Sequence, residues 1–218
     1  MKENQEMSSG YEYDVFVSYK SGSTNEEWLN DIFLPLFKPK LLEAFLNERM
    51  GRPNIFIDEE DINPGADWKK VLKDKLAKTK CLVAIWTPTY FFDSPWCINE
   101  YAAMNFRQLE LEKLEIIKAN GGIIVPFLKQ SIESLPSFAS RIKYLDYTKF
   151  NRVGKGFKDS GDYDLLQIKI DEDAKKIAKQ IKQSPSWHED FAKDDWLYGP
   201  FDFLNELGGS LHQTKPTW

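Results

Sequence analysis

Five short, mostly apolar runs separated by segments with helical spacing are the feature that most constrains the fold of this chain. The runs cover residues 13–18, 54–57, 81–86, 123–128 and 143–147. They lack the strict alternation of apolar and polar residues that marks a strand with one face in water, so parallel strands covered on both faces are expected. The sequence therefore predicts a three-layer α/β fold whose five-stranded parallel sheet has the flavodoxin-like strand order 2-1-3-4-5.

A helix with an internal break is predicted after the first run. Asn25, with Glu26 and Glu27 behind it, is predicted to cap a helix whose first turn is acidic. Pro35 and Pro39 are predicted to break that helix before it resumes.

Later helix signals are clearer. Ser94 is predicted to cap a helix with Pro95 at its first position, and that helix is expected to run toward the Asn-Gly-Gly of residues 120–122. Apolar residues three and four apart predict a last helix over residues 170–183.

The length of 218 residues suits one domain of ordinary size with a short appendage. We expect a flexible N-terminus over residues 1–10, the α/β domain over residues 11–184, and a C-terminal extension over residues 185–218. The extension holds two lysines and six acidic residues, so it carries −4 of the net charge of −5. It also holds three of the seven tryptophans, and we expect these apolar side chains to pack on another surface.

Composition argues against several functions. A net charge of −5 disfavours binding to nucleic acid. No apolar run approaches the roughly 20 residues of a membrane-spanning helix, and the N-terminus lacks the apolar stretch of a secretory signal. The two cysteines, Cys81 and Cys97, lie in unrelated contexts, which favours a reducing, cytoplasmic location.

Several kinds of site lack their residues. Both histidines, His188 and His212, lie in the extension, and no Cys-x-x-Cys or His-Glu-x-x-His spacing occurs, so no metal site is predicted. No Gly-x-Ser-x-Gly elbow is present, and the first strand does not run into Gly-x-Gly-x-x-Gly. Glycines 156 and 161 have the outer spacing of a phosphate loop, but Asp162 and Tyr163 follow them, so a surface loop is predicted.

In the predicted strand order, ligands bind where strands 1 and 3 end, which points to the loops over residues 19–25 and 87–95. Directly after the second loop, Trp96 and Glu100 stand four residues apart on one face of a predicted helix. The pair suits an aromatic plate beside a functional carboxylate. It also suits a half-buried helix anchor and a glutamate that favours the positive end of the helix dipole.

Three blocks of sequence resemble the three boxes of Toll/interleukin-1 receptor (TIR) domains in order and spacing. The first is Tyr-Asp-Val-Phe-Val-Ser-Tyr at 13–19, the second is Ile-Phe-Ile-Asp-Glu-Glu-Asp-Ile-Asn-Pro-Gly at 55–65, and the third is Ser-Pro-Trp-Cys-Ile-Asn-Glu at 94–100. The resemblance covers residues 11–183. It implies the same flavodoxin-like sheet that the apolar runs predict independently.

Bacterial enzymes of that family carry a Trp-x-x-x-Glu motif whose glutamate is catalytic, and Trp96 to Glu100 matches it. The resemblance therefore implies that Glu100 cleaves the N-glycosidic bond between nicotinamide and ribose in NAD+, which would be a substrate and not a cofactor. Nicotinamide is cationic in NAD+ and leaves as a neutral molecule, so no general acid has to protonate it. One carboxylate that stabilises the developing oxocarbenium cation can suffice.

The resemblance also implies substrate contacts near the catalytic carboxylate. Tyr19, Lys20 and Ser21 match the loop that lines the nucleotide site in the family, and Trp96 would stack on a base or close the pocket. Lys20 stands where many family members have arginine, which weakens the case for bidentate phosphate binding, and a solvated loop charge is the alternative. Trp68 is a further candidate, although its place at the start of an apolar helical stripe favours the core.

A family interface corresponds to a third loop. Asp61, Ile62, Asn63, Pro64 and Gly65 match the BB loop, which often packs on a neighbouring protomer and completes the active site there. The resemblance therefore implies self-association through TIR surfaces. A simple turn at the Pro-Gly pair is the alternative.

Taken together, these features predict an NAD+ nucleosidase that makes ADP-ribose or a cyclic or conjugated ADP-ribose signal. The chain resembles the stand-alone TIR proteins of bacterial anti-phage systems such as Thoeris, in which the product acts on a separate effector protein. The alternatives are a virulence factor, a non-catalytic signalling adaptor, and a flavodoxin-like binder of a nucleotide or flavin.

Overall fold

The computed structural model describes residues 10–22, 24–57, 68–117, 122–133 and 135–193. The predicted flexible N-terminus, apart from Gly10, lies outside this part of the chain. So do residues 194–218 of the predicted extension and the predicted BB loop at residues 61–65.

Five parallel strands form one sheet in the order β2-β1-β3-β4-β5, which confirms the predicted fold class. The strands are β1 (Tyr13–Ser18), β2 (Ile55–Ile57), β3 (Thr79–Trp86), β4 (Ile124–Leu128) and β5 (Leu145–Asp146). The central strands β1 and β3 pair from Tyr13 beside Thr79 to Ser18 beside Ala84. Their carboxyl ends therefore finish side by side, as the topology predicts.

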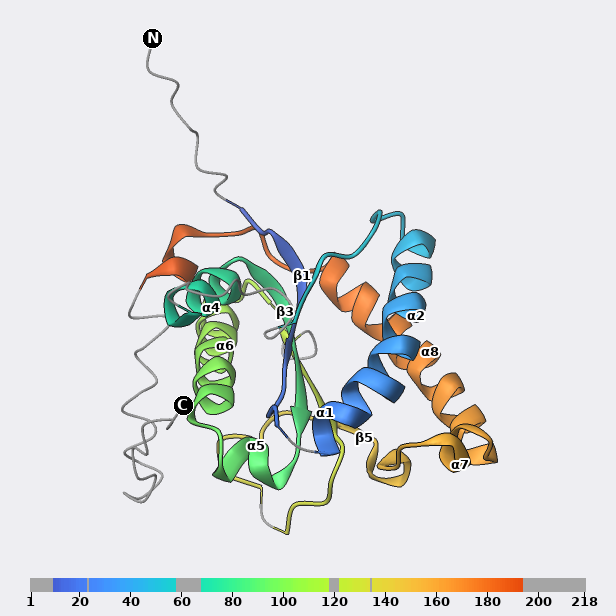
Figure 1. The fold of residues 1–218 in the computed structure, drawn as a ribbon. Helices are drawn as coiled ribbons and strands as arrows, with labels where there is room; N and C mark the ends of the chain where they lie inside the picture. The colour runs from blue at the N-terminus through green and yellow to red at the C-terminus, as the bar shows by residue number, and fades with distance from the viewer. Residues whose placement is uncertain (1–9, 23, 58–67, 118–121, 134, 194–218) are drawn as a thin grey trace.

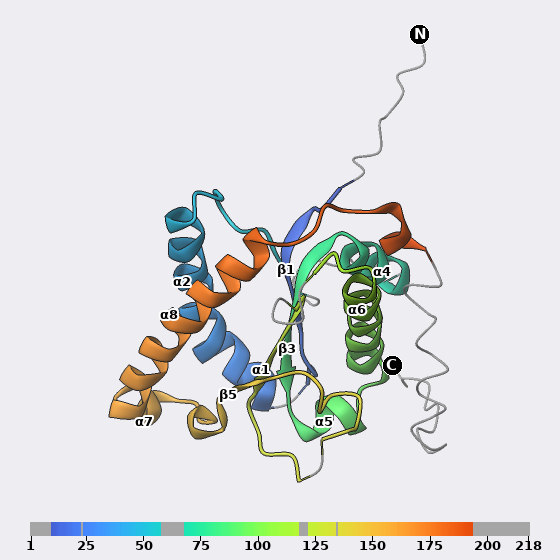
Figure 2. The ribbon, with the colours of Figure 1, turned by 180° about the vertical axis from the view of Figure 1, so that it is seen from behind.

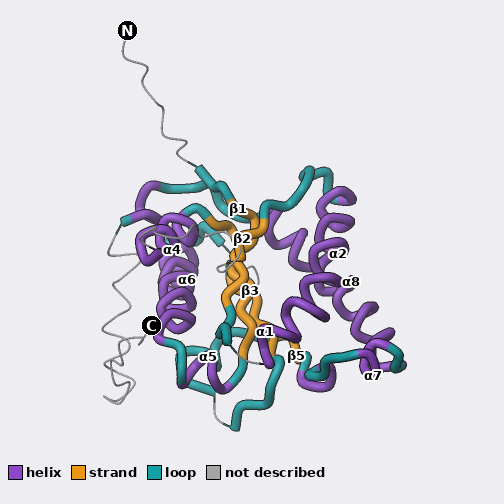
Figure 3. The backbone as a smooth tube through the Cα atoms, viewed as in Figure 1, coloured by secondary structure: helices purple, strands orange, loops and turns teal. Residues whose placement is uncertain are grey.

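Helices cover both faces of the sheet, so that three layers form (Figures 1 and 2). The tube view in Figure 3 shows the strands between α2 and α8 on one side and α4 and α6 on the other. Successive residues of a strand point to opposite faces, and the strands accordingly supply two separate cores. One core takes Val15, Val17, Val83 and Ile85, and the other takes Phe16, Leu82, Ala84 and Trp86. This burial on both faces explains why the sequence segments that form these strands are apolar throughout.

The predicted break at Pro35 and Pro39 is wrong. Here α1 (Thr24–Trp28), a π-helical turn (Leu29–Phe33) and α2 (Leu34–Asn47) follow one another without a gap. The amide of Leu34 donates to the carbonyl of Leu29, five residues back, so the widened turn leads directly into the turn that holds Pro35. Pro39 gives up one helical hydrogen bond at a cost of roughly 3 kcal/mol. Full burial of neighbours such as Phe37 offsets it, since each large apolar side chain contributes about 1.5–3 kcal/mol.

The remaining helices largely follow the predicted order. They are α4 (Trp68–Ala77), α5 (Pro88–Phe92), α6 (Pro95–Lys113), a 3-10 turn (Thr148–Phe150), α7 (Lys155–Lys158), α8 (Gly161–Lys182) and a second 3-10 turn (Glu189–Ala192). Ser94 caps α6 as predicted, because its Oγ accepts from the amide of Cys97 at 3.3 Å. In contrast to the prediction, α6 ends well before residue 120 and α8 begins before residue 170. None of the helices in the described ranges has the length and apolar character needed to cross a membrane.

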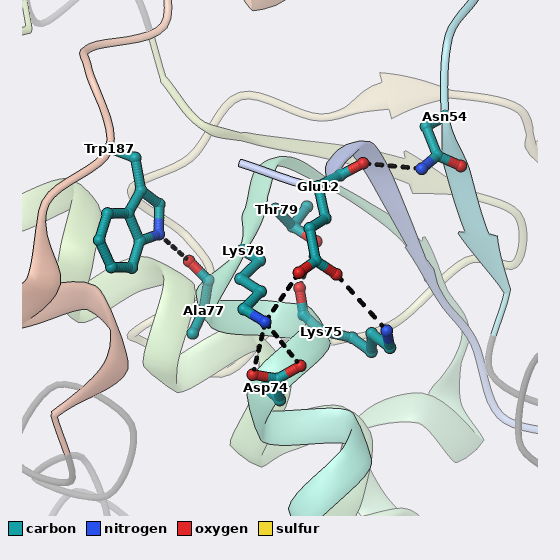
Figure 4. Close-up of polar contacts among 8 residues, drawn as sticks. All are labelled: Glu12, Asn54, Asp74, Lys75, Ala77, Lys78, Thr79 and Trp187. Carbon is teal, nitrogen blue, oxygen red and sulfur yellow. Dashed lines mark hydrogen bonds and ion pairs between the residues drawn. The ribbon is translucent and has the colours of Figure 1, made fainter. Parts of the chain in front are cut away.

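The first part of the C-terminal extension packs on α4 through Trp187, as expected, whereas Trp196 and Trp218 lie outside the described residues. The indole of Trp187 donates to the carbonyl of Ala77 at 3.1 Å, at the end of α4 (Figure 4). Nearby, Lys78 bridges Glu12 and Asp74, so the same corner also ties the start of β1 to α4. Phe191 is almost fully buried against the α4 and α6 side of the sheet.

Arg107 of α6 lies under Phe191 and donates hydrogen bonds to backbone carbonyls at the end of α4. Its guanidinium is 4.6 Å from the ring centroid of Phe191 and only 3% of the residue is exposed. Its nitrogens donate to the carbonyls of Leu76 and Thr79 at 3.1 and 3.0 Å. Carbonyls at a helix end have no partner within the helix, so Arg107 acts as a cap supplied by another helix.

We predict that Arg107→Lys lowers the free energy of unfolding by about 2 kcal/mol. A lysine ammonium cannot reach the carbonyls of both Leu76 and Thr79, as the guanidinium does. Each buried carbonyl left without a donor costs roughly 1–3 kcal/mol. Urea denaturation followed by circular dichroism measures the change. The matched control is Arg52→Lys, an exposed position, and a loss for Arg107→Lys no larger than the control's would contradict the capping role.

Candidate active site at the carboxyl ends of the strands

Three side chains from three elements meet where β1 and β3 end. Ser18 is the last residue of β1, Tyr90 lies in α5 directly after β3, and Glu100 lies in the second turn of α6. All three are buried. The parallel pairing of β1 with β3 brings them together, although Ser18 and Glu100 are 82 residues apart in the sequence.

Glu100 is the acidic member of this group. The hydroxyl of Ser18 donates to its Oε2 at 2.6 Å, and only 7% of Glu100 is exposed. A carboxylate in such a position is oriented by its donor and lies largely outside bulk water. It can therefore act electrostatically on a positive charge that develops beside it.

Tyr90 completes a short chain of hydroxyl groups. Its Oη is 2.9 Å from the Oγ of Ser18. Burial raises the pKa of Tyr90 well above its ordinary value, with the Cys97 and Glu100 side chains contributing in the same direction, so the phenol keeps its proton at neutral pH. Since the only hydroxyl proton of Ser18 goes to Glu100, the Tyr90 hydroxyl must donate to Ser18.

The first turn of α6 is held independently of this chain. The Oγ of Ser94 accepts from the Cys97 amide and donates to the Cys97 thiol at 3.0 Å. Because Ser94 and Cys97 lie within two turns of Glu100, this cap fixes the part of the helix that carries the carboxylate.

A second polar chain runs from the end of β4 through α1 to α5. The ammonium of Lys129, which directly follows β4, donates to Asn25 Oδ1 at 2.6 Å. The amide of Asn25 donates to Thr89 at 3.3 Å, and Thr89 lies 3.0 Å from the hydroxyl of Thr87. This chain links α1, α5 and the end of β4. The predicted cap at Asn25 is therefore wrong: Asn25 lies inside α1, and its side chain is used across the fold.

Lys129 is an unusual residue for a buried position. It is 1% exposed, and its ammonium lies 5.6 Å from the centroid of the Trp28 ring. Burial lowers the pKa of Lys129 to about 8. A positive charge is thus held close to the carboxyl edge of the sheet at neutral pH.

In the sequence, the predicted substrate-binding loop lies between Ser18 of the first chain and Asn25 of the second. Tyr19, Lys20 and Ser21 are partly buried and follow Ser18 directly. Tyr19 packs against the core shared by α2 and α8, whereas Glu100 belongs to the opposite helical layer. The amide of Gly22 donates to Glu26 at 2.8 Å, which closes the loop onto α1.

Of the other predicted site residues, the structure describes the side chain of Trp96 only. Trp96 is half-buried in the first turn of α6, one turn before Glu100, which agrees with either sequence interpretation. Trp68 begins α4, and its side chain lies outside the described part of the chain, as do Asp61, Ile62, Asn63, Pro64 and Gly65.

Four residues of the site were not singled out from the sequence as functional. Ser18 is the one hydroxyl residue in an otherwise buried strand end, which is a usable signal. The local sequence carries no such signal for Tyr90, Asn25 and Lys129, because their hydrogen-bond partners are 64 to 104 residues away. In the described ranges, no group of three or more His, Cys, Asp or Glu side chains is arranged to hold a metal ion.

Comparison with protein families gives one match over most of the domain. The sequence matches the family described as TIR domain over residues 15–159, which is more than half of the chain. No curated protein matches the sequence.

Solved structures that are similar to the chain include two sets of TIR domains at low identity. One is the TIR domain of the Toll-related receptor TRR-2 from the lower metazoan Hydra magnipapillata, with 21% identity, a TM-score of 0.40, and coverage of 62% of this chain and 85% of that chain. The other is the TIR domains of the activated Roq1 resistosome recognising the pathogen effector XopQ, with 21% identity, a TM-score of 0.34, and coverage of 77% and 84%.

We predict that Ser18→Ala and Tyr90→Phe are energetically coupled. Ser18→Ala leaves the buried Tyr90 hydroxyl without its acceptor, at a cost of roughly 1–3 kcal/mol, whereas the double variant removes both groups. The double variant is therefore expected to lose less stability than the sum of the single variants, by about 1 kcal/mol. Urea unfolding of the four proteins measures the coupling, and strict additivity would show that the two hydroxyls do not interact.

We also predict a pH dependence that Lys129 causes. Its pKa is about 8 in the fold and near 10.5 in the unfolded chain, so the unfolded chain holds more protons between these values. The contribution of Lys129 to the free energy of unfolding therefore rises with pH between these two pKa values, by roughly 1 kcal/mol per pH unit at most. Relative to Lys129→Met, the wild-type protein should become more stable between about pH 8 and 10.

Urea denaturation of both proteins across that pH range tests the effect of Lys129. Lys158→Met, at an exposed position, is the control for loss of one lysine. Parallel curves for wild type and Lys129→Met would contradict the prediction.

Proposed function

Since the chain belongs to the TIR domain family, we propose that it is an NAD+ nucleosidase that cleaves the bond between nicotinamide and ribose. The observation that carries the proposal is the buried carboxylate of Glu100, held by Ser18 at the carboxyl ends of β1 and β3. Ligands of doubly wound sheets bind at this edge.

The chemistry fits a site with one carboxylate. When the bond between ribose C1 and the pyridinium nitrogen breaks, the electron pair goes to the nitrogen and nicotinamide leaves neutral. The sugar becomes an oxocarbenium cation, and a carboxylate beside it lowers the energy of that state. Water then adds to the cation and releases a proton to give ADP-ribose, or a nitrogen of the adenine adds to give a cyclic product.

The surroundings of Glu100 support an electrostatic role. Charges interact more strongly where water is excluded, and a carboxylate already oriented by Ser18 needs little rearrangement during the reaction. We assign substrate contacts to Tyr19, Lys20, Ser21, Trp96 and Trp68, on the basis of their match to the family's site.

Further parts of the proposal concern assembly and biological role. We propose that the domain self-associates through TIR surfaces that include the BB loop, that it acts in the cytoplasm, and that its product signals to a separate effector in bacterial anti-phage defence. These statements follow from resemblance to stand-alone bacterial TIR proteins. They predict that activity rises more than linearly with protein concentration if a partner completes the site.

We predict that Glu100→Gln lowers NAD+ cleavage by roughly 10²–10³-fold, because the amide has the shape of the carboxylate without its charge. The measurement is chromatography with mass detection of free nicotinamide, over a range of protein concentrations. The matched control is Glu110→Gln, which makes the same change on the same helix and should keep wild-type activity.

Two results would overturn the proposal at different levels. Equal activity of wild type and Glu100→Gln would remove Glu100 from catalysis while leaving an enzyme. If concentrated wild-type protein released no nicotinamide, the chain would be assigned to the non-catalytic adaptors of the family. The mass of the second product separates hydrolysis from cyclisation.

A further inference from the structure

A large cavity lies at the amino-terminal side of the sheet edge, at the opposite end of the strands from Glu100. Its volume is about 690 Å³, within the range of sites for small molecules. Its walls come from α6, α8, the start of β4 and the segment that leads into β5.

The cavity results from the shortness of β5. Only Leu145 and Asp146 pair with β4, opposite Phe127 and Leu128. The first residues of β4 therefore have no neighbouring strand on that side, while α6 and α8 run along opposite faces of the sheet (Figure 2). The space between the two helices is left open at the edge of the sheet.

Both helices present polar faces to the cavity. From α6 come Asn105, Gln108, Leu109 and Glu112, and from α8 come Asp173, Lys176, Ile177 and Gln180. Each set has the spacing i, i+3, i+4, i+7 that defines one helical face. Three of these residues, Asn105, Gln108 and Gln180, carry amides, which both donate to and accept from hydroxyl groups.

Hydrogen bonds to the backbone and to Glu112 hold the two glutamines in place. The Ile123 amide donates to Gln108 Oε1 at 2.9 Å, and the Gln108 Nε2 donates to Glu112 at 2.9 Å. The Gln180 amide donates to the carbonyl of Gly122. The walls are therefore built before any ligand arrives, which reduces the entropy lost on binding.

Five charged side chains line the cavity: the acidic Glu112 and Asp173, and the basic Arg141, Lys143 and Lys176. Arg141 and Lys143 line it and are exposed, and neither has an ion-pair partner among the described residues. The charge of Asp173 is already compensated, since Tyr147 donates to it at 2.9 Å and Lys169 and Lys176 lie 3.3 and 2.8 Å from it.

We propose that this cavity binds a small phosphorylated sugar. The guanidinium fork of Arg141, together with Lys143, suits a phosphate at the mouth. The amides of Asn105, Gln108 and Gln180 suit sugar hydroxyls inside. Two positive side chains without acidic partners, next to pre-positioned amides, distinguish this cavity from an incidental gap in packing.

The test is calorimetric titration of the full chain with ribose 5-phosphate and glucose 6-phosphate, with ribose, glucose and inorganic phosphate as comparison probes. We expect at least one sugar phosphate to bind at least tenfold more tightly than its parent sugar and than inorganic phosphate. The double variant Arg141→Glu/Lys143→Glu should weaken that binding by tenfold or more. Asn105→Trp, which fills the cavity and keeps its charges, should do the same.

The control is Lys155→Glu/Lys158→Glu, an equal change of charge at exposed positions of α7, which should bind as the wild type does. Circular dichroism checks that each variant is folded. Absence of binding by both sugar phosphates would overturn the proposal. Binding that is equal for inorganic phosphate and unchanged by Asn105→Trp would also overturn it, because it would show only a surface contact with an anion.

Discussion

The structure depends on one constraint: a parallel sheet that is buried on both faces. β3 runs for eight residues with almost no contact with water, and β1 lies beside it with four consecutive buried residues. Such strands need helices on each side, and the pleat then divides the interior into two cores. The connections between strands and helices are forced to the two ends of the sheet, and it is there that polar side chains gather.

At the carboxyl edge the polar groups are buried together, and this is costly unless each finds a partner. The chain from Tyr90 through Ser18 to Glu100 and the chain from Lys129 through Asn25 to Thr89 satisfy that requirement. Trp86 lies close by in sequence with an indole nitrogen that has no partner among the described residues. Apolar side chains at the positions of Lys129, Glu100 and Tyr90 would avoid the free energy that is needed to remove polar groups from water. The presence of these three polar residues at the carboxyl edge therefore favours a functional site over a purely structural role.

Local patterns predicted the strands because a buried strand leaves its signature in consecutive residues. They failed for α1 and α2, where Pro35 and Pro39 argued for a break and the burial of Phe37 and its neighbours outweighed them. The same limit applies to the site. Glu100 could be named because the third box resembles a family motif, but Ser18, Tyr90 and Lys129 are defined by partners at separations of 72 to 104 residues, which only the sheet brings together.

The position of Glu100 is fixed by contacts at two places along α6 and not only at the candidate site. Glu100 contacts the end of β1 through Ser18, Arg107 caps the end of α4, and Gln108 accepts from the amide of Ile123 just before β4. These anchors span eight residues, or about 12 Å of helix at 1.5 Å per residue. A rotation of α6 by one residue would turn every anchor by about 100° and break all three together. Three anchors therefore fix the carboxylate relative to the sheet, as the electrostatic role proposed for Glu100 would require, and two of them lie away from the candidate site.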